Sequence, residues 1–354
     1  MKRRLVFVLI FSFLIHGQAL AADAAPAVSA KAMILYHAPS GRVLAEKNAD
    51  DILHIASTTK LMTALAAVRR GDLEAEVEIR PEWAGTEGSS MYLTPGETYT
   101  LRELLEGMLL TSGNDAALAV AETVSGSQSS FVEEMNRIAG ELRLSCTHYA
   151  NPHGLDEEGH YSTARDLAIL MGHVMEEPVL RDILGMTSVR IHDKIYANHN
   201  KLLKLCPGVN GGKTGYTRSA GRCLVSSCQR DGLELICVTL SDPEDWRDHE
   251  ALYDWGFSRY RSFTGADVTL PAVPLITGGE EKTDWEKPFM LCVDRNSTLT
   301  REVRLPRFLF TAADPGERAG EILIRENGAL LSALPLIWSG IGERETAFLG
   351  AIPV

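Results

Sequence analysis

A serine and a lysine stand ahead of an otherwise apolar stretch of the chain. In "HIASTTKLMTALAAVRRG", Ser57 and Lys60 precede the apolar run 61–68. Residues three apart share a helical face, so the two side chains meet if the segment is helical from about Ser57 onward. Burial and the positive end of the helix macrodipole both lower the pKa of a lysine placed there. Such a lysine is a general base, and a serine beside it is an activated nucleophile.

These residues alone also allow a simpler explanation. Ser57, Thr58 or Thr59 could be an N-cap, with Lys60 extending to solvent. Serine and lysine are both common, so S-x-x-K occurs by chance in many chains of this length. The chemical hypothesis therefore depends on what else the sequence holds.

Two more short motifs carry polar side chains of suitable chemistry. "LLTSGNDAALAV" holds Ser112 and Asn114 in a turn between two predicted helices, where both are also good N-cap residues. "VNGGKTGYTRSAGRCLV" holds Lys213, Thr214 and Gly215 just before or on a predicted strand, and could be only a turn leading into an edge strand. Each motif is weak evidence when it is taken alone.

The elements that must position these motifs are two hairpins around a helical region. "AMILYHAPSGRVLAEKN" predicts two strands with a turn at Pro39 to Gly41, and "GRCLVSSCQRDGLELICVTLS" predicts a hairpin with a D-G turn. Between them, "TLRELLEGMLL", "DAALAVAETV", "SSFVEEMNRIAGELRL" and "STARDLAILMGHVMEE" have helical spacing of apolar residues. "DHEALYDWGFSRY" predicts a closing helix. We therefore expect one sheet built from distant segments, with an inserted helical subdomain.

The remainder of the chain has a different pattern. From about Ser262 the sequence contains short strand-like runs, "FMLCVD", "REVRLP", "AGEILI" and "ALLSALPLIWS", with turns at "DPGE" and "ENG". This predicts a second, all-β domain. The expected organisation is a signal peptide at 1–24, an α/β domain at 25–261 and a β-rich domain at 262–354. No internal repeat or low-complexity segment is evident.

The N-terminus and the net charge indicate where the protein acts. Three basic residues, an apolar run and "ALAADA" form a secretory signal peptide, with cleavage expected after Ala21 or Ala24. The apolar run is too short for a membrane-spanning anchor. The formal net charge of -12 argues against nucleic acid and against adhesion to anionic lipid. An anionic substrate must therefore be met by a few local cations.

The cysteines show no metal or redox motif. Their count is even, which permits disulfides in an exported protein, but no C-x-x-C or zinc spacing occurs. A two-residue turn would place Cys228 opposite Leu235 and not opposite Cys237. Buried free thiols are therefore the expectation for Cys146, Cys206, Cys223, Cys228, Cys237 and Cys292.

The three motifs, in this order and on these elements, resemble those of penicillin-binding proteins and class A β-lactamases. The segments "ASTTKLMTAL", "PGETYTLRELLEGMLLTSGNDAALAVAE", "NPHGLDEEGHYSTARDLA" and "GGKTGYTRSAGRCLV" are similar to D-alanyl-D-alanine carboxypeptidases, the low-molecular-mass penicillin-binding proteins of the peptidase S11 type. The similarity covers most of residues 30–260. It implies a β-lactamase/DD-peptidase-like α/β fold and a serine acyl-enzyme peptidase without metal or cofactor.

The resemblance also implies a role for each motif residue. Ser57 would attack the carbonyl between two terminal D-alanines of a peptidoglycan stem peptide, and Lys60 would take its proton. Ser112 would relay a proton to the leaving amine. The residues implied in binding the substrate are Asn114, Lys213, Thr214 and Gly215, and the backbone N–H groups of Ser57 and Tyr216 would form the oxyanion hole.

The sequence leaves two residues and several activities open. Arg247, in "PEDWRDHE", stands near the place where many relatives carry a carboxylate-binding arginine, and His153 could line the site or be structural. A class A β-lactamase would need an E-x-x-L-N segment between Ser112 and Lys213, and none is present. A DD-endopeptidase and an inactive peptidoglycan-binding module remain as alternatives.

The C-terminal segment does not resemble a membrane anchor. "ALLSALPLIWS" is about half the length of a membrane span, contains Pro335, and is better explained as the last strand of the β-rich domain. The segment "GIGERETAFLGAIPV" lacks the basic face of an interfacial helix. We therefore expect a protein that is soluble in the envelope space or only loosely peripheral, with stem peptides and β-lactams as its ligands. The oligomeric state stays open.

Overall fold

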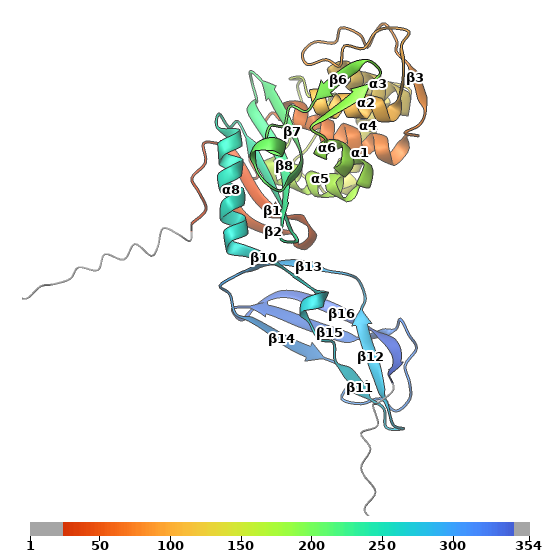
Figure 1. Cartoon of the computed structure of the whole chain (residues 1–354), viewed down its shortest axis with the longest axis vertical. Helices are drawn as coiled ribbons and strands as arrows, with labels where there is room; N and C mark the ends of the chain where they lie inside the picture. The colour runs from red at the N-terminus through yellow and green to blue at the C-terminus, as the bar shows by residue number, and fades with distance from the viewer. Residues whose placement is uncertain (1–23, 343–354) are drawn as a thin grey trace, which may run out of the picture.

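The computed structural model describes residues 24–342 of the chain. The predicted signal peptide lies outside these residues except for its last position, and so does the tail after residue 342. Figure 1 shows a sheet with helices on both faces, followed by a second, strand-rich unit. Among the described residues, no helix has the length and apolarity needed to cross a bilayer.

The first sheet joins strands from the two ends of the first unit. Its order is β2-β1-β9-β8-β7, and all neighbouring strands are antiparallel. Strand β1 pairs with β9, which confirms the expected sheet of distant segments, and Cys228 lies opposite Leu235 as predicted. The strands are β1 (Ala32–His37), β2 (Arg42–Lys47), β7 (Val209–Thr217), β8 (Gly221–Arg230) and β9 (Leu233–Leu240).

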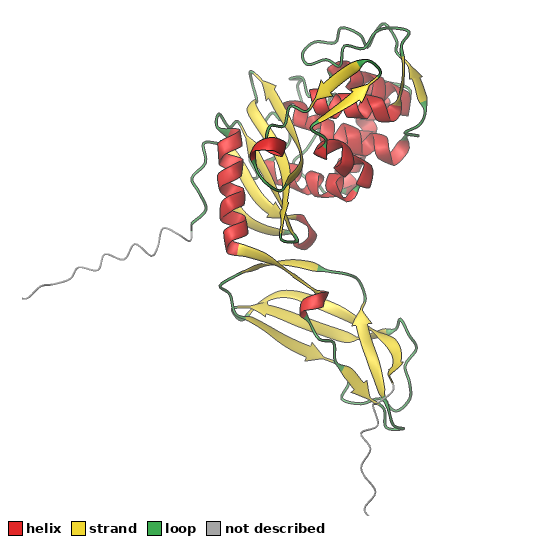
Figure 2. Ribbon diagram, viewed as in Figure 1, coloured by secondary structure: helices red, strands yellow, loops and turns green. Residues whose placement is uncertain are grey.

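Most of the helical region between β2 and β7 covers one face of this sheet (Figure 2), and only its last turn, residues 202–205, packs on the other face. Its helices are α1 (Lys60–Arg70), α2 (Leu101–Thr111), α3 (Asn114–Ser125), α4 (Gln128–Glu141), α5 (Ala164–Glu176), α6 (Pro178–Gly185) and the single turn α7 (Leu202–Leu205). Two small hairpins accompany them, β3 (Glu76–Glu78) with β4 (Thr98–Thr100) and β5 (Ser188–Ile191) with β6 (Lys194–Ala197). The predicted inserted helical subdomain is therefore confirmed.

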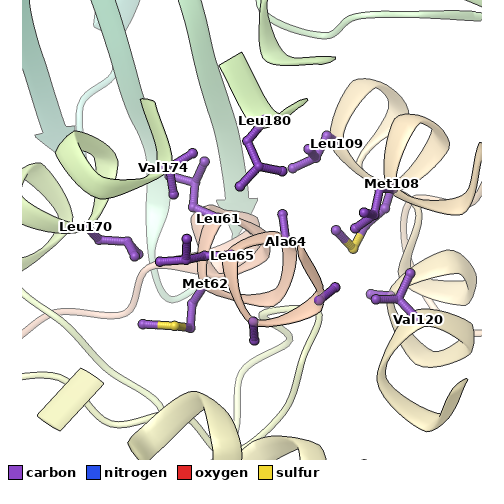
Figure 3. Packing of buried hydrophobic residues seen from close by; sticks show 14 of the residues in the cluster. Leu61, Met62, Ala64, Leu65, Met108, Leu109, Val120, Leu170, Val174 and Leu180 are labelled. Carbon is purple, nitrogen blue, oxygen red and sulfur yellow. The ribbon is translucent and has the colours of Figure 1, made fainter. Parts of the chain in front are cut away.

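Helix α1 is the centre of this helical region. Its residues from Lys60 to Ala67 are all buried, as expected for a helix that is apolar on nearly every side. Figure 3 shows Leu61, Ala64 and Leu65 of α1 among side chains of the surrounding helices. A truncation such as Leu65→Ala would cost about 2–5 kcal/mol, because the close-packed surroundings can collapse only partly. The start of α1 is thus fixed by packing on all sides.

The opposite face of the sheet is covered by α8 (Asp245–Arg259). Leu35, Leu235, Leu252 and Tyr253 are fully buried in the cluster between them. Gly256 allows the close approach, because a Cβ there would lie 2.9 Å from leucine side chains of both β1 and β9. The sheet is thus the middle one of three layers.

The second unit is built of strands, as predicted. A two-stranded sheet pairs β10 with β13, and a five-stranded sheet has the order β11-β12-β16-β15-β14. The predicted run "ALLSALPLIWS" lies in the last strand, as expected. The strands are β10 (Tyr260–Thr264), β11 (Ala272–Pro274), β12 (Glu280–Trp285), β13 (Met290–Asp294), β14 (Leu299–Arg304), β15 (Arg318–Glu326) and β16 (Ala329–Gly342).

The six cysteines are free thiols in the structure. Five are buried, in agreement with the expectation, whereas Cys146 is only partly buried. Burial raises the pKa of the Cys223 thiol to about 12, so this sulfur is an inert part of the core.

Candidate active site

The S-x-x-K motif lies at the junction of a 3-10 turn and helix α1. Ser57 belongs to the turn Ala56–Thr59, and the α-helix begins only at Lys60, later than predicted. The Lys60 Nζ nevertheless donates a hydrogen bond of 3.1 Å to the Ser57 Oγ. Thr59 does occupy the N-cap position of α1, although its side chain makes no capping hydrogen bond, whereas the expectation that Lys60 extends to solvent is wrong, because Lys60 is fully buried.

Three acceptors surround the Lys60 ammonium. Besides Ser57 Oγ, its Nζ donates to Asn114 Oδ1 at 2.6 Å and to the carbonyl oxygen of His153 at 2.6 Å. Burial lowers the pKa of Lys60 well below its ordinary value, the nearby Lys213 cation lowers it further, and Asp115 opposes both effects. The pKa shift favours the neutral amine that a general base requires.

The S-x-N motif forms the tight connection between α2 and α3. Ser112 ends α2 with a left-handed φ of 63°, and Gly113 is the N-cap of α3. The N-cap explanation of Ser112 and Asn114 is therefore wrong. The Asn114 Nδ2 donates to the Glu87 carbonyl at 2.6 Å, which turns its Oδ1 toward Lys60.

A neighbouring carboxylate holds the loop that covers this connection. Asp115, fully buried, accepts hydrogen bonds from the backbone N–H groups of Met91 and Leu93 and from the Ser90 hydroxyl. The Asn114 N–H donates to the Ser89 carbonyl at 2.7 Å. Asp115 was not predicted as a site residue, and its position directly after S-G-N was the only available signal in the sequence.

The K-T-G motif lies on β7, an edge strand of the sheet. Lys213 is 1% exposed, and its Nζ donates to Ser112 Oγ at 3.0 Å and to the Thr214 carbonyl at 2.8 Å. This contact joins the second motif to the third. Burial lowers the pKa of Lys213 to about 7.

Gly215 brings strand β7 against the nucleophile turn. A Cβ at this position would lie 3.0 Å from the Ser57 backbone nitrogen and 3.1 Å from the Ile55 carbonyl oxygen. The absent side chain therefore permits close packing of β7 on the turn. Tyr216 follows at the rim, with its side chain 68% exposed.

A cleft of about 290 Å3 opens above these residues. The predicted residues that line it are Ser57, Ser112, Thr214, Gly215 and Tyr216, and the others that line it are Ser89, His199, Arg222, Asp245 and Trp246. Lys60, Asn114 and Lys213 are buried behind the lining and bonded to it or to one another. Its only carboxylate is Asp245, which is paired with Arg222.

The arginine at this cleft is not the one that the sequence suggested. Arg247 is 69% exposed, pairs with Glu244 and Asp248, and does not line the cleft. Arg222 lies on β8 opposite Tyr216, and its Nη2 donates to both oxygens of Asp245 at 2.7 and 2.9 Å. Only the strand register reveals this neighbour, so no motif could have identified it.

His153 contributes its backbone to the site. Its carbonyl accepts from Lys60, while its ring Nδ1 accepts from the Leu155 N–H at 3.2 Å. Burial and the nearby Lys60 lower the pKa of His153 to about 3. The ring does not line the cleft, which favours the structural alternative.

Within residues 24–342, no group of three or more histidine, cysteine or acidic side chains is arranged to hold a metal ion. The site is defined by two serines, each hydrogen-bonded to a buried lysine. Such an arrangement is typical of serine enzymes that use a lysine as the base.

Comparisons with known proteins agree with this class. The model of the peptidase S11 family, described as D-alanyl-D-alanine carboxypeptidase, matches residues 19–244. D-alanyl-D-alanine carboxypeptidase DacF of Bacillus subtilis (strain 168) is 31% identical over 327 residues, with 87% of this chain and 84% of the relative covered. D-alanyl-D-alanine carboxypeptidase DacC of Escherichia coli (strain K12) is 38% identical over 276 residues, with 72% of this chain and 68% of the relative covered.

A solved structure is similar over nearly the whole chain. Penicillin binding protein 5 from Haemophilus influenzae superposes with a TM-score of 0.77 and 26% identity, covering 90% of this chain and 99% of that one. This likeness includes the strand-rich second unit. The chain belongs to the peptidase S11 family of serine-type D-alanyl-D-alanine carboxypeptidases.

Proposed function

We propose that this protein removes the terminal D-alanine from peptidoglycan stem peptides through an acyl-enzyme at Ser57. The observation that carries the proposal is the meeting of all three motifs at one cleft, with Lys60 on Ser57 and Lys213 on Ser112. Metal-free hydrolysis of an amide needs a nucleophile, a base and a route for a proton to the leaving group. The two serine–lysine pairs provide these functions.

In the acylation step, neutral Lys60 accepts the Ser57 proton as Oγ attacks the penultimate D-alanine carbonyl. The C–O bond forms, and the negative charge moves to the former carbonyl oxygen. The backbone N–H groups of Ser57 and Tyr216 are the proposed donors to this oxyanion. Each donor of this kind is worth about a hundredfold to a thousandfold in rate.

In the second half of acylation the C–N bond breaks. Ser112, held by Lys213, donates its proton to the departing nitrogen, and the proton that Lys60 took from Ser57 replaces it, so that Lys60 is neutral again and Lys213 keeps its charge. The product is free D-alanine and an ester on Ser57. Water then attacks this ester with Lys60 again as the base, which releases the shortened peptide and restores Ser57.

The groups proposed to bind the substrate are the cations and the amide side chain around the nucleophile. We assign the terminal carboxylate to the Thr214 hydroxyl and the Lys213 cation, with Arg222, which also lines the cleft, as a further cation. Asn114 is the proposed partner of the acyl-side amide. These local cations would attract the anionic substrate although the net charge of the protein is -12.

We also propose an exported protein that acts in the cell envelope, soluble or loosely peripheral after removal of residues 1–24. The catalytic unit is assigned to residues 25–261 and the β-rich unit to 262–354. β-Lactams would acylate Ser57 because they mimic the D-Ala-D-Ala end. No cofactor is required by the proposed chemistry.

A DD-endopeptidase is the second candidate, because the same residues would act on a cross-link. A β-lactamase is less well supported, since no glutamate lines the cleft to activate a deacylating water. Purified protein should be incubated with synthetic stem pentapeptide and, separately, with a cross-linked stem-peptide dimer. The products are then identified by mass spectrometry. Loss of one alanine from the pentapeptide supports the proposal, and cleavage of only the dimer contradicts it.

A further inference from the structure

The residue before the nucleophile has an unfavourable backbone conformation. Ala56 is buried and has a left-handed φ of 48°. This region costs a residue with a Cβ about 1–2 kcal/mol, so it persists only where the surroundings enforce it. Because Ala56 directly precedes Ser57, its conformation sets the direction in which the nucleophile leaves the chain.

A chain of side-chain hydrogen bonds ends on the carbonyl of this residue. The Thr59 hydroxyl donates to the Ala56 carbonyl oxygen at 2.7 Å. His160 Nε2 lies 2.7 Å from the same hydroxyl oxygen, and the Ala150 N–H donates to His160 Nδ1 at 3.1 Å. Gly154 closes the other side, since a Cβ there would overlap the Ala56 carbonyl.

The donor groups determine which atom donates in each of these hydrogen bonds. A backbone N–H can only donate, so Nδ1 of His160 is the unprotonated nitrogen. In a neutral ring the proton is then on Nε2, which donates to Thr59 Oγ1. Thr59 can in turn donate only toward Ala56, so the histidine determines where the hydroxyl proton points.

His160 is buried in the structure and does not reach the reacting atoms. It is 3% exposed, packs edge-on against Tyr149 with ring centroids 5.8 Å apart, and does not line the cleft. Burial lowers its pKa to about 4, so the ring is neutral near pH 7. Its hydrogen bond toward the site is the one to Thr59.

We infer that His160 is a positioning residue that acts through Thr59 to hold Ala56 in its left-handed conformation and thereby aims Ser57 at the substrate. This inference rests on the proposed function and adds to it a residue outside the three motifs. Loss of the histidine leaves the cleft and its cations in place. It should therefore slow acylation of Ser57 and change substrate binding little.

The test compares four variants by their rate of acylation with fluorescent penicillin, their KM for stem pentapeptide and their melting temperature. Thr59→Val and His160→Leu should each slow acylation at least tenfold, with KM within about threefold of wild type. The double variant should be no slower than either single variant, because each single substitution already interrupts the same series of hydrogen bonds. His160→Gln should retain most of the rate, since an amide can accept from Ala150 and donate to Thr59.

His148→Leu is the matched control, because His148 is an exposed ring on the same segment that bonds Gly159 and does not contact Thr59. It should acylate at the wild-type rate. A Thr59→Val variant that acylates at the wild-type rate would overturn the inference, and so would losses that add in the double variant. If wild-type protein itself forms no adduct at Ser57, the proposed function fails instead.

Discussion

Two buried lysines in one site have different tasks because they contact different serines. Lys60 donates to Ser57, whereas Lys213 donates to Ser112. Burial lowers the pKa of both lysines, and the cation of Lys213 further lowers that of Lys60. The proposed base must lose its proton, whereas the proposed carboxylate ligand must keep it. This conflict predicts a pH dependence that differs between substrates.

The first prediction concerns the charge of Lys213. A lysine is cationic below its pKa, and that of Lys213 is lowered to about 7, so the cation is present at pH 6 and largely lost at pH 8. The ratio of kcat/KM for a D-Ala-D-Ala peptide to that for a small neutral ester should fall about tenfold per pH unit above pH 7. Lys213→Ala should remove this dependence. A ratio that stays constant from pH 6 to 9 would contradict the assignment.

The second prediction compares two arginines that are close in sequence but differently placed. Arg222 lines the cleft and Arg247 does not. Arg222→Gln should raise KM for the carboxylate-bearing peptide about tenfold, because one charge-assisted hydrogen bond is lost, and should leave the neutral ester unaffected. Arg247→Gln should change neither value. Equal effects of the two variants would exclude Arg222 as a carboxylate ligand.

At the scale of elements, the site is a set of short junctions, each fixed by a packed neighbour. The 3-10 turn before α1 is pressed against β7, and the α2–α3 connection is tied to the loop 87–93. Asp115 holds this loop through three hydrogen bonds. The geometry of the cleft thus depends on groups, such as Asp115, that do not line it.

The third prediction tests this anchor. Asp115→Ala leaves the buried N–H groups of Met91 and Leu93 without acceptors, so the free energy of unfolding should fall by about 3 kcal/mol. Asp182→Ala, which breaks an exposed pair with Arg102, should change it by less than about 1 kcal/mol. Urea unfolding measures both values. Equal stabilities of the two variants would show that Asp115 is not an anchor.

The sequence predicted the elements well because their patterns are local. Hydrophobic periodicity and the D-G turn were sufficient for the sheet and the inserted helices, and the order of the three motifs identified the candidate site residues, whose roles stay predictions. Some missed features are local, such as the hairpin of β5 and β6, but the missed contributions to the site are non-local. Arg222 reaches the cleft through strand register, and the His153 carbonyl is a backbone acceptor that no side-chain pattern encodes. The start of α1 was misplaced because a 3-10 turn has the same i, i+3 spacing.

At the scale of the whole molecule, the two units are joined by charged side chains. Arg42 at the start of β2 donates to the Cys292 carbonyl at 2.7 Å, pairs with Glu326 at 2.9 Å and lies over the Tyr260 ring. Arg259 pairs with Asp294 at 3.1 Å nearby. These contacts link the first sheet and the end of α8 to the strand-rich unit.

The fourth prediction addresses this joint. Arg42→Ala leaves the half-buried Glu326 carboxylate without its cation and should lower the free energy of unfolding by about 2 kcal/mol. Arg165→Ala, which breaks exposed pairs with Glu46 and Asp50, should cost about 1 kcal/mol or less. Small-angle scattering should show a broader distance distribution only for Arg42→Ala, with penicillin acylation unchanged. Identical scattering curves would show that other contacts suffice.

The proposed catalysis depends on acylation of Ser57, which intact-mass spectrometry detects. Protein incubated with benzylpenicillin should gain the mass of one penicilloyl group, and tryptic mapping should place the adduct on Ser57. Ser57→Ala should gain no mass, while His148→Leu should gain it as the wild type does. An adduct that persists in Ser57→Ala, or one that maps to another residue, would contradict the account.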